Sequence, residues 1–254
     1  MRVLCEARSD VGRKRKGNED SLFLNPEQKL YVVADGMGGH AAGEVASRVA
    51  VDAINEFVAL TGGNEEITWP FGLDDSISYE GNRLKTAIRQ ANRSVLEATR
   101  RSAEYEGMAT TVAAVLVDGD VANLAHVGDS RIYLWSDDQI ELLTRDHSWV
   151  NEQIENGAIS PEQARSHPLR NVVTRALGGR ADLVVDVQSR QMTGGEILLL
   201  CSDGLTTMIG DEDIGRIFGE AQGDIARTAT ALVAEANQRG GEDNITVVLL
   251  KFEE

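Results

Sequence analysis

The sequence predicts an α+β fold: a four-layer α-β-β-α sandwich in which helices flank two central, mainly antiparallel sheets. Two long amphipathic helices occur early and one late, and apolar runs typical of strands surround them. The central strands follow one another closely, with Asp118-Gly119 as a two-residue hairpin signal, so we expect antiparallel pairing. Strands that are apolar on both faces need cover on both sides, which two packed sheets with outer helices provide.

The first half of the chain alternates strands with the two long helices. Strand patterns occupy residues 3–7, 21–25 and 30–34, and helical patterns cover about 41–59 and 82–104, with a polar loop over 61–81. Apolar residues spaced four apart predict the buried face of the first helix: Val45, Val49, Ala53 and Phe57. A similar stripe predicts that of the second helix: Leu84, Ile88, Ala91 and Val95.

The second half is rich in strands. They are expected at residues 110–117, 121–127, 131–135, 139–143, 183–189, 196–202 and 244–252, with a helix over 224–238. Residues 146–180 are irregular, with short helical pieces. Because the chain has no linker, repeat or low-complexity tract, we expect a single domain over residues 1–254.

Composition excludes several classes of function. The net charge is -16 and the pI about 4.7, so nucleic acid and anionic membranes are not expected as partners. Cys5 and Cys201 lack C-x-x-C spacing and lie in apolar runs, which indicates buried, reduced thiols. The sequence shows no secretory signal and no apolar run of membrane-spanning length, so we expect a cytoplasmic monomer.

Carboxylates stand where apolar strands meet turns. Asp35 ends the apolar run 30–34 and is followed by three glycines at 36, 38 and 39. The same position is shared by other acids: Glu19, Asp20, Asp129, Asp203 and Asp243. One such acid is usually a turn former, but a cluster at one rim of a sheet would repel itself unless a cation were bound. Oxygen ligands without a His/Cys cluster favour Mg²⁺ or Mn²⁺ over zinc.

A basic stretch, RKRKG at residues 13–17, directly precedes Glu19 and Asp20 in an otherwise acidic protein. It is either a solvated loop or an anion-binding arm. Arginine forks onto two phosphate oxygens better than lysine does, so the second reading indicates a phosphorylated substrate.

These motifs together resemble one protein family. They are SDVGRKRKGNEDS (9–21), VVADGMGGHAAGEVAS (32–47), ATTVAAVLV (109–117), AHVGDSRIY (125–133), LTRDHS (143–148), VVTRALG (172–178), LLCSDGLT (199–206) and GEDNITVVL (241–249). In this order they resemble the metal-dependent, type 2C serine/threonine protein phosphatases in their bacterial form. The resemblance implies a sandwich fold with a binuclear Mn²⁺ or Mg²⁺ centre at one edge.

The resemblance also implies the ligands of the two principal metal ions. Asp35 matches the acid that bridges both ions, and the carbonyl of Gly36 matches a further ligand. Glycine at that position lets the backbone approach the ion closely. Asp203 and Asp243 match the acids that complete the shell of the first metal.

Other residues match supporting roles in the family. Glu19 and Asp20 match acids that help to hold the centre, largely through bound water. Arg15 matches the arginine that binds the substrate phosphate, which makes it a catalytic candidate together with the bridging acid. Asp129 matches a ligand of a third, weaker metal, shared with Asp203.

The implied reaction is hydrolysis of phosphoserine and phosphothreonine on proteins, opposing a Ser/Thr kinase. A hydroxide that bridges the metals attacks phosphorus without a phosphoenzyme. Ser130 and Cys201 are therefore not expected to be nucleophiles. Residues 146–180 match the family's variable flap, which lies beside the active site and suggests a role in substrate choice.

The sequence does not assign the general acid, the group that protonates the leaving oxygen of the substrate. Many relatives place a histidine two residues after the bridging acid, where this chain has Met37. His40 is out of register and either serves this role or simply begins the helix. The remaining histidines are expected to have structural roles or to lie at the surface: His126, His147 and His167.

Two other functions remain as alternatives. The first is a catalytically weak regulatory module of the same fold that binds phosphoproteins. The second is a nucleotide-binding protein, but DGMGGH lacks the G-x-x-x-x-G-K-[ST] pattern of a phosphate-binding loop.

Overall fold

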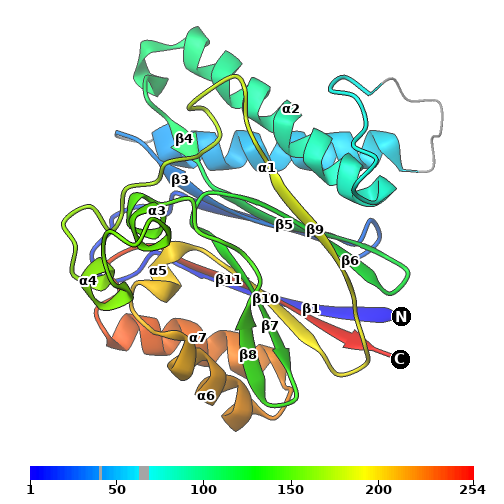
Figure 1. Ribbon diagram of the computed structural model, residues 1–254, viewed down its shortest axis with the longest axis vertical. Helices are drawn as coiled ribbons and strands as arrows, with labels where there is room; N and C mark the ends of the chain where they lie inside the picture. The colour runs from blue at the N-terminus through cyan, green and yellow to red at the C-terminus, as the bar shows by residue number, and fades with distance from the viewer. Residues whose placement is uncertain (40–41, 63–68) are drawn as a thin grey trace.

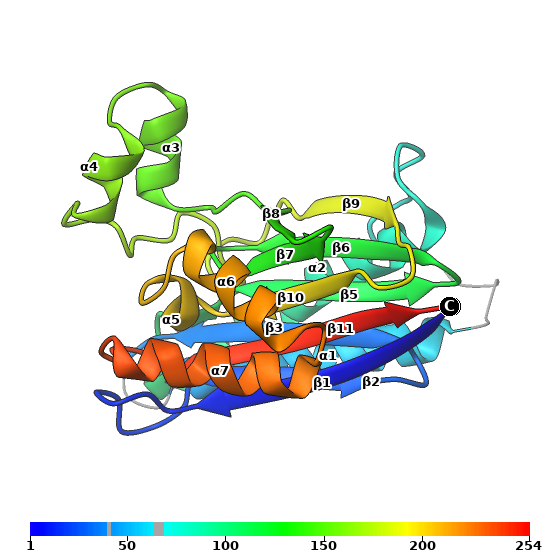
Figure 2. The same ribbon diagram turned by 90° about the horizontal axis from the view of Figure 1, so that it is seen from below.

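Two antiparallel sheets pack face to face in the computed structural model, which describes residues 1–39, 42–62 and 69–254 (Figures 1 and 2). One sheet contains, in spatial order, β1 (Arg2–Asp10), β11 (Ile245–Glu253), β10 (Ile197–Cys201), β7 (Arg131–Ser136) and β8 (Gln139–Leu142). The other contains β2 (Asp20–Asn25), β3 (Leu30–Met37), β5 (Val112–Asp118), β6 (Val121–Val127) and β9 (Asp186–Gln191), with the short β4 (Ala109–Thr110) paired to β3.

Helices cover both outer faces, so the predicted four-layer sandwich is confirmed. The second sheet is covered by α1 (Ala42–Thr61) and α2 (Tyr79–Arg101), and the first by α6 (Asp211–Ala221) and α7 (Ile225–Gln238) (Figure 1). The remaining helices are short: η1 (Ala103–Tyr105), α3 (Trp149–Glu155), α4 (Pro161–Arg165) and α5 (Asp203–Thr206). In Figure 2, α3 and α4 stand clear of the sandwich, as the short helical pieces predicted within residues 146–180.

Period-two alternation along the strands builds three separate cores. On β3, Leu30 and Val32 face the helices α1 and α2, whereas Tyr31 and Val33 face the opposite sheet. On β10, Leu198 and Leu200 fill the space between the sheets. The intervening residues of β10 pack against α6 and α7, and they include Cys201. Strands buried on both faces therefore read as continuous apolar runs, which is why they were recognisable in the sequence.

The helix α1 differs from its predicted orientation. The fully buried stripe is one residue further along: Ala46, Ala50, Ile54 and Val58. The residues predicted to be buried, such as Val45 and Phe57, are half-buried and pack at the edge of this core. Small alanines let α1 lie close to the sheet, and larger side chains fill the flanks. The stripe predicted on α2 is confirmed, because all four residues are buried.

Several boundaries also differ from the prediction. The helix α6 was not predicted, α2 begins at Tyr79 rather than about 82, and β9 begins at Asp186 rather than 183. The β5–β6 hairpin turns at Gly119 and Asp120, because Asp118 still pairs with Val121. Of the predicted polar loop 61–81, residues 63–68 lie outside the described residues, as does His40. Among the helices that the structure describes, none is both long and apolar enough to cross a membrane.

The topology brings several chain segments to one edge of the sandwich. In the second sheet, β2 begins where β3 ends, since Asp20 pairs with Asp35. In the first sheet, β10 ends where β11 begins, since Cys201 pairs with Val247. The flap helices lie at this edge, and both chain termini lie at the opposite end (Figure 1). Antiparallel neighbours therefore gather the predicted acids although they are far apart in sequence.

Candidate metal centre

A cleft of about 270 Å³ opens at this edge. Its lining includes seven of the eight predicted site residues: Arg15, Glu19, Asp35, Gly36, Asp129, Asp203 and Asp243. The eighth, Asp20, does not line the cleft and lies behind it, next to Asp35 on the neighbouring strand. The remaining lining residues were not predicted as contributors: Met37, Gly38, Asn171 and Val173.

Asp35 is held through its backbone. Its N–H donates to Thr111 Oγ1 at 3.1 Å, and its carbonyl accepts from Thr111 N at 2.9 Å and from Thr110 Oγ1 at 2.9 Å. Thr111 Oγ1 is also hydrogen-bonded to the buried Ser130 Oγ, at 2.6 Å. Ser130 therefore supports the strand end that carries Asp35, in agreement with the expectation that it is not a nucleophile.

Close packing of the backbone requires a glycine at position 36. A Cβ at this position would lie 2.1 Å from the carbonyl oxygen of Gly43, in the first turn of α1, and 2.5 Å from that of Glu19. Real Cβ atoms do not approach backbone oxygens this closely, so only glycine lets α1 start directly above the end of β3. Gly36 thus lets a helix N-terminus lie close to the acid.

Asp203 and Asp243 flank the paired ends of β10 and β11. Asp203 is the first residue of α5, and Asp243 precedes β11. The two segments touch closely, since a Cβ at Gly204 would lie 2.0 Å from the carbonyl oxygen of Asn244. Arg15 reaches across from the basic stretch, and its Nη2 donates to Asp243 Oδ2 at 2.7 Å. Arg15 is half exposed at the mouth of the cleft, where a soluble anion can reach it.

Glu19 and Asp20 are positioned by two residues that we did not predict. The N–H of Glu19 donates to Asn244 Oδ1 at 2.8 Å, and Asn244 Nδ2 donates to the carbonyls of Val11 and Gly17 at 2.9 Å each. Ser202 Oγ donates to Asp20 Oδ2 at 2.8 Å. The other oxygen of Asp20, Oδ1, is buried and has no hydrogen-bond partner within the described part of the chain. A buried, orphaned carboxylate oxygen is costly unless a cation or water satisfies it.

The carboxylates raise one another's pKa. Burial, reinforced by the charges of Asp20 and Asp203, raises the pKa of Asp35 well above its ordinary value. Burial raises the pKa of Asp129 to about 8, with the charge of Asp203 adding to the effect. Burial likewise raises the pKa of Asp20 to about 7, and burial with the charge of Asp243 raises that of Asp203 to about 6. Such a cluster of hard oxygen donors fits divalent cations, which relieve this repulsion.

Cysteine and histidine take structural positions here. Cys201 is fully buried, and burial raises the pKa of its thiol to about 12, which argues against a nucleophile. Cys5 is also a free thiol but is half-buried rather than buried. His126 and His147 are buried against one another, and His167 stacks on Trp149. His40, one candidate for the general acid, lies outside the described residues, and Met37 lines the cleft.

Comparison with known proteins identifies the family. The family model described as protein phosphatase 2C matches residues 13–244. The chain belongs to the protein phosphatase 2C family. It is 38% identical over 254 residues to the serine/threonine phosphatase stp of Listeria innocua, a match that covers 97% of this chain and 95% of that one.

Solved structures of this family share the fold. The crystal structure of the Mycobacterium tuberculosis serine/threonine phosphatase PstP/Ppp superposes with a TM-score of 0.87, at 35% identity and with complete coverage of both chains. A structure of the catalytic domain of serine threonine protein phosphatase PstP holds two manganese ions. It gives a TM-score of 0.84 at 32% identity and covers 99% of each chain.

Proposed function

We propose that this chain is a metal-dependent protein phosphatase that hydrolyses phosphoserine and phosphothreonine on proteins. One observation carries the proposal: five acids from separate segments and one arginine converge on a single cleft. Carboxylates supply hard oxygen ligands, and an exposed guanidinium beside them supplies a phosphate-binding fork. Membership of the protein phosphatase 2C family supports the same reaction.

Two divalent cations, Mn²⁺ or Mg²⁺, are the proposed cofactors, and Asp129 and Asp203 are proposed as ligands of a third, weaker site. Asp35 is the proposed bridging ligand, joined by the carbonyl of Gly36 and by Asp203 and Asp243. Glu19 and Asp20 support the centre from the β2 side. Bound there, the cations would act as Lewis acids that activate water for attack on phosphorus.

Arg15 is the proposed phosphate-binding residue. Its guanidinium pairs with Asp243 in this structure, so it is already directed towards the carboxylates. A phosphoryl group entering the cleft offers it oxygens in the same bidentate geometry that a carboxylate does. By neutralising charge on the phosphoryl oxygens, Arg15 stabilises the transition state as well as the bound substrate.

The partners follow from this chemistry. The proposed substrates are proteins phosphorylated by a Ser/Thr kinase. The phosphatase itself is proposed to be a monomer in the cytoplasm. The net charge of -16 disfavours nucleic acid and anionic membranes. Residues 1–254 form one catalytic domain, and the flap at 146–180 contributes Asn171 and Val173 to the cleft wall, where they can contact the protein substrate.

A hydrolysis assay tests the proposal. Full-length protein treated with a chelator is incubated with a phosphoserine or phosphothreonine peptide, and released inorganic phosphate is measured with and without added Mn²⁺. We expect hydrolysis only with the metal, and its loss when chelator is added again. Tight binding of the peptide without hydrolysis would instead support the regulatory-module alternative. Hydrolysis that continues in excess chelator would contradict a metal-dependent mechanism.

A further inference from the structure

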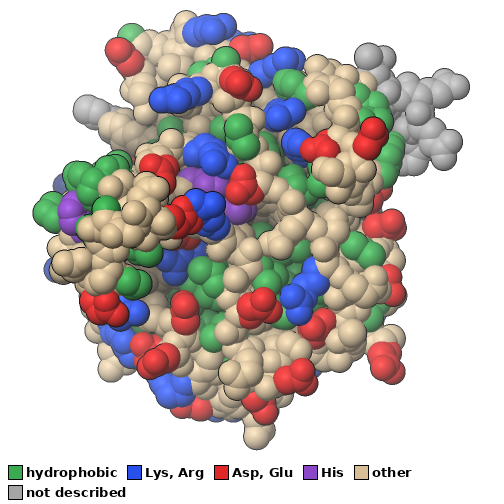
Figure 3. Space-filling model, in the orientation of Figure 1, with side chains coloured by type: hydrophobic (Ala, Val, Ile, Leu, Met, Phe, Trp, Pro, Cys, Tyr) green, Lys and Arg blue, Asp and Glu red, His purple; other side chains and the backbone are tan. Residues whose placement is uncertain are grey.

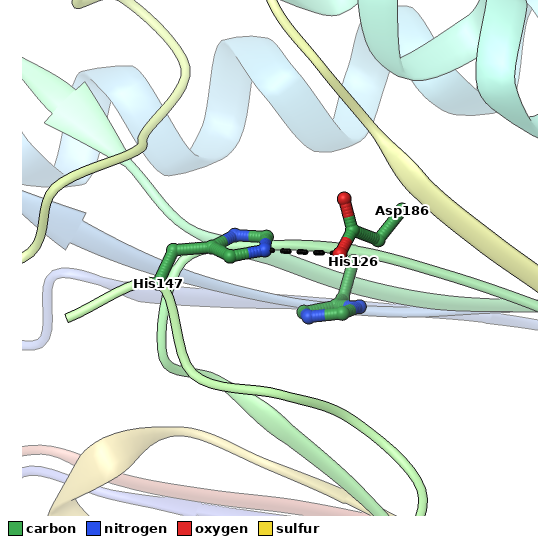
Figure 4. Close-up of side chains that lie close together, drawn as sticks. All are labelled: His126, His147 and Asp186. Carbon is green, nitrogen blue, oxygen red and sulfur yellow. Dashed lines mark hydrogen bonds and ion pairs between the residues drawn. The ribbon is translucent and has the colours of Figure 1, made fainter. Parts of the chain in front are cut away.

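His126, His147 and Asp186 form a compact cluster (Figure 4). It adjoins the candidate metal centre, because His147 is hydrogen-bonded to Gly128, the residue before Asp129. The two imidazole rings are buried and stacked, with centroids 4.7 Å apart and planes 13° from parallel. His147 Nε2 lies 3.3 Å from Asp186 Oδ2. In the space-filling view, imidazoles lie in a hollow bordered by acidic and basic side chains (Figure 3).

The cluster resembles a metal-ligand set, but its geometry does not suit a metal. Nearly parallel stacked rings direct their nitrogen lone pairs into separate planes, whereas a tetrahedral ion needs them to converge on one point. The place of a cation is also taken by Arg175, whose Nη1 lies 2.7 Å from Asp186 Oδ1 and 2.9 Å from His147 Nε2. His126 Nε2 is engaged with the carbonyl of Arg145 at 2.8 Å.

Both ring nitrogens of His147 are engaged. Gly128 N–H donates to His147 Nδ1 at 3.0 Å, so Nδ1 carries a lone pair. Nε2 faces Arg175 Nη1 at 2.9 Å and Asp186 Oδ2 at 3.3 Å, which hold the ring from the other side. Burial, with the charges of His126 and Arg175, lowers the pKa of His147 to about 4, in keeping with a neutral ring. Asp186 and Arg175 therefore hold the ring at Nε2 and keep Nδ1 directed at the Gly128 N–H.

The backbone of His147 joins the flap to the turn after β6. Its N–H donates to the carbonyl of Gly128 at 2.9 Å, and its carbonyl accepts from Thr174 N at 2.8 Å. Gly128 has φ +106° and directly precedes Asp129, and a Cβ there would lie 2.6 Å from the Thr111 side chain. The turn that carries Asp129 is thus held by His147 on one side and by the support of Asp35 on the other.

We infer that His147 is a positioning residue for Asp129: its Nδ1 and backbone N–H fix Gly128, and Asp186 with Arg175 fixes the ring. Because Val173, one residue before Thr174, lines the cleft, the same link ties the flap wall to the Asp129 turn. The inference rests on the proposed function, in which Asp129 is a ligand of the third, weaker metal.

Two substitutions of His147 separate this role from general packing. An asparagine places a carbonyl oxygen near the position of Nδ1 and can still accept from Gly128. A glutamine carries its polar atoms near Nε2 and leaves the Gly128 N–H without an acceptor. Mn²⁺ binding to the full-length variants is measured by calorimetry, together with kcat, KM for a phosphopeptide and melting temperature.

We expect His147→Gln to weaken the weakest Mn²⁺ binding event about 10- to 100-fold, the usual effect of losing a residue that orients a ligand. It should lower kcat with little change in KM, whereas His147→Asn should recover most of the Mn²⁺ affinity. His126→Gln is the matched control, because it can still donate to the Arg145 carbonyl, and the Gly128 N–H donates to His147 rather than to residue 126. It should leave Mn²⁺ affinity unchanged. Equal Mn²⁺ affinity in His147→Gln and wild type would overturn the inference, as would equal losses in the Gln and Asn variants.

Asp129→Ala distinguishes failure of this inference from failure of the proposed site. If Asp129→Ala loses the weak Mn²⁺ event but His147→Gln keeps it, Asp129 remains a ligand and His147 does not position it. If Asp129→Ala binds Mn²⁺ as wild type does, Asp129 is not a metal ligand and the inference about His147 is wrong. The hydrolysis assay still tests separately whether the protein is a phosphatase. Should His147→Gln fail to fold, Asp186→Ala replaces it, and wild-type Mn²⁺ affinity in that variant would overturn the inference.

Discussion

Asp35 lies in a cluster of buried acids that repel one another. Its carboxylate is placed beside Asp20 and near Asp203 and Asp129, and all four have a raised pKa because burial and mutual repulsion disfavour their charged forms. Three backbone hydrogen bonds nevertheless fix its position. A protein that keeps such an arrangement gives up stability in exchange for a site prepared to bind cations.

The substitution Asp35→Asn tests this directly. Removing one charge relieves the repulsion, so the melting temperature of the metal-free protein should stay the same or rise. An amide cannot bridge two cations as a carboxylate does, so Mn²⁺-dependent hydrolysis should fall by about 100-fold or more, the usual effect of deleting one electrostatic group from an active site. Thermal melts and phosphate release are measured on the same preparation. Near-normal turnover would remove Asp35 from the centre.

Arg15 offers a second residue-scale prediction. Arg15→Ala should raise KM for a phosphopeptide roughly 10- to 100-fold, the equivalent of one charge-assisted hydrogen-bonding group. Mn²⁺ affinity should not fall, since the substitution frees Asp243 from its 2.7 Å ion pair. Arg15→Lys should recover only part of the loss, because an ammonium cannot fork onto two oxygens. A collapse of Mn²⁺ affinity with unchanged KM would make Arg15 a structural residue.

The acids of the site could be predicted from the sequence, but the residues that hold them could not. An acid at the end of an apolar strand is visible as a local pattern, as at Asp35 and Asp203. Asn244 is not visible in this way, because its role is a hydrogen bond to Glu19, 225 positions away in the chain. Thr111 reads as an ordinary strand residue until the fold places it under Asp35.

At the scale of elements, strands were easier to predict than helix faces. Strands of the two sheets are apolar on both sides, so their runs stand out, whereas α1 buries alanines that carry little hydrophobic signal. The helix α6 did carry a signal: three acids in its first turn and buried residues at 214, 217, 218 and 221. Gly215 and Gly219 interrupt that pattern and favour a loop reading, but contacts with the sheet and α7 override this local preference.

The junction between β3 and α1 can be tested with a matched pair of glycines. Gly36→Ala would place a Cβ 2.1 Å from the Gly43 carbonyl oxygen, so we expect a loss of about 1–3 kcal/mol in the free energy of unfolding and a displaced Asp35 with reduced activity. Gly39→Ala meets no atom of the described residues within 4 Å and should be close to neutral. Chemical denaturation and hydrolysis rates measure both. Equal stability of the two variants would contradict the close approach at Gly36.

On the scale of the whole molecule, the site should control how stability depends on pH. In metal-free protein the unfolded carboxyls ionise near pH 4, but in the folded state the pKa of Asp129 is raised to about 8 and that of Asp20 to about 7. The folded state therefore binds more protons than the unfolded state in the neutral range. The contribution of these protonated carboxyls to stability is fully present below their unfolded pKa, near pH 4, and is lost as pH rises through their folded pKa values.

Melting temperatures measured in chelator should accordingly fall between pH 6.5 and 8.5. His147, whose pKa is lowered to about 4, adds an opposing rise only near the ordinary histidine pKa of about 6.5, so the fall should be clearest in the upper part of this window. Saturating Mn²⁺ should raise the melting temperature more at pH 8.5 than at pH 6.5, because the ion binds the deprotonated carboxylates. A melting temperature that rises with pH in chelator would contradict the arrangement of the acids.

The central claim is that acids from both sheets form one metal centre, and anomalous diffraction from crystals grown with Mn²⁺ tests it most directly. We expect two strong Mn²⁺ peaks in the cleft, with Asp35 in contact with both and Asp203 or Asp243 in contact with at least one. The same crystals should show no peak between the stacked rings of His126 and His147. A cleft without anomalous density, or ions held at the histidine cluster instead, would contradict the account.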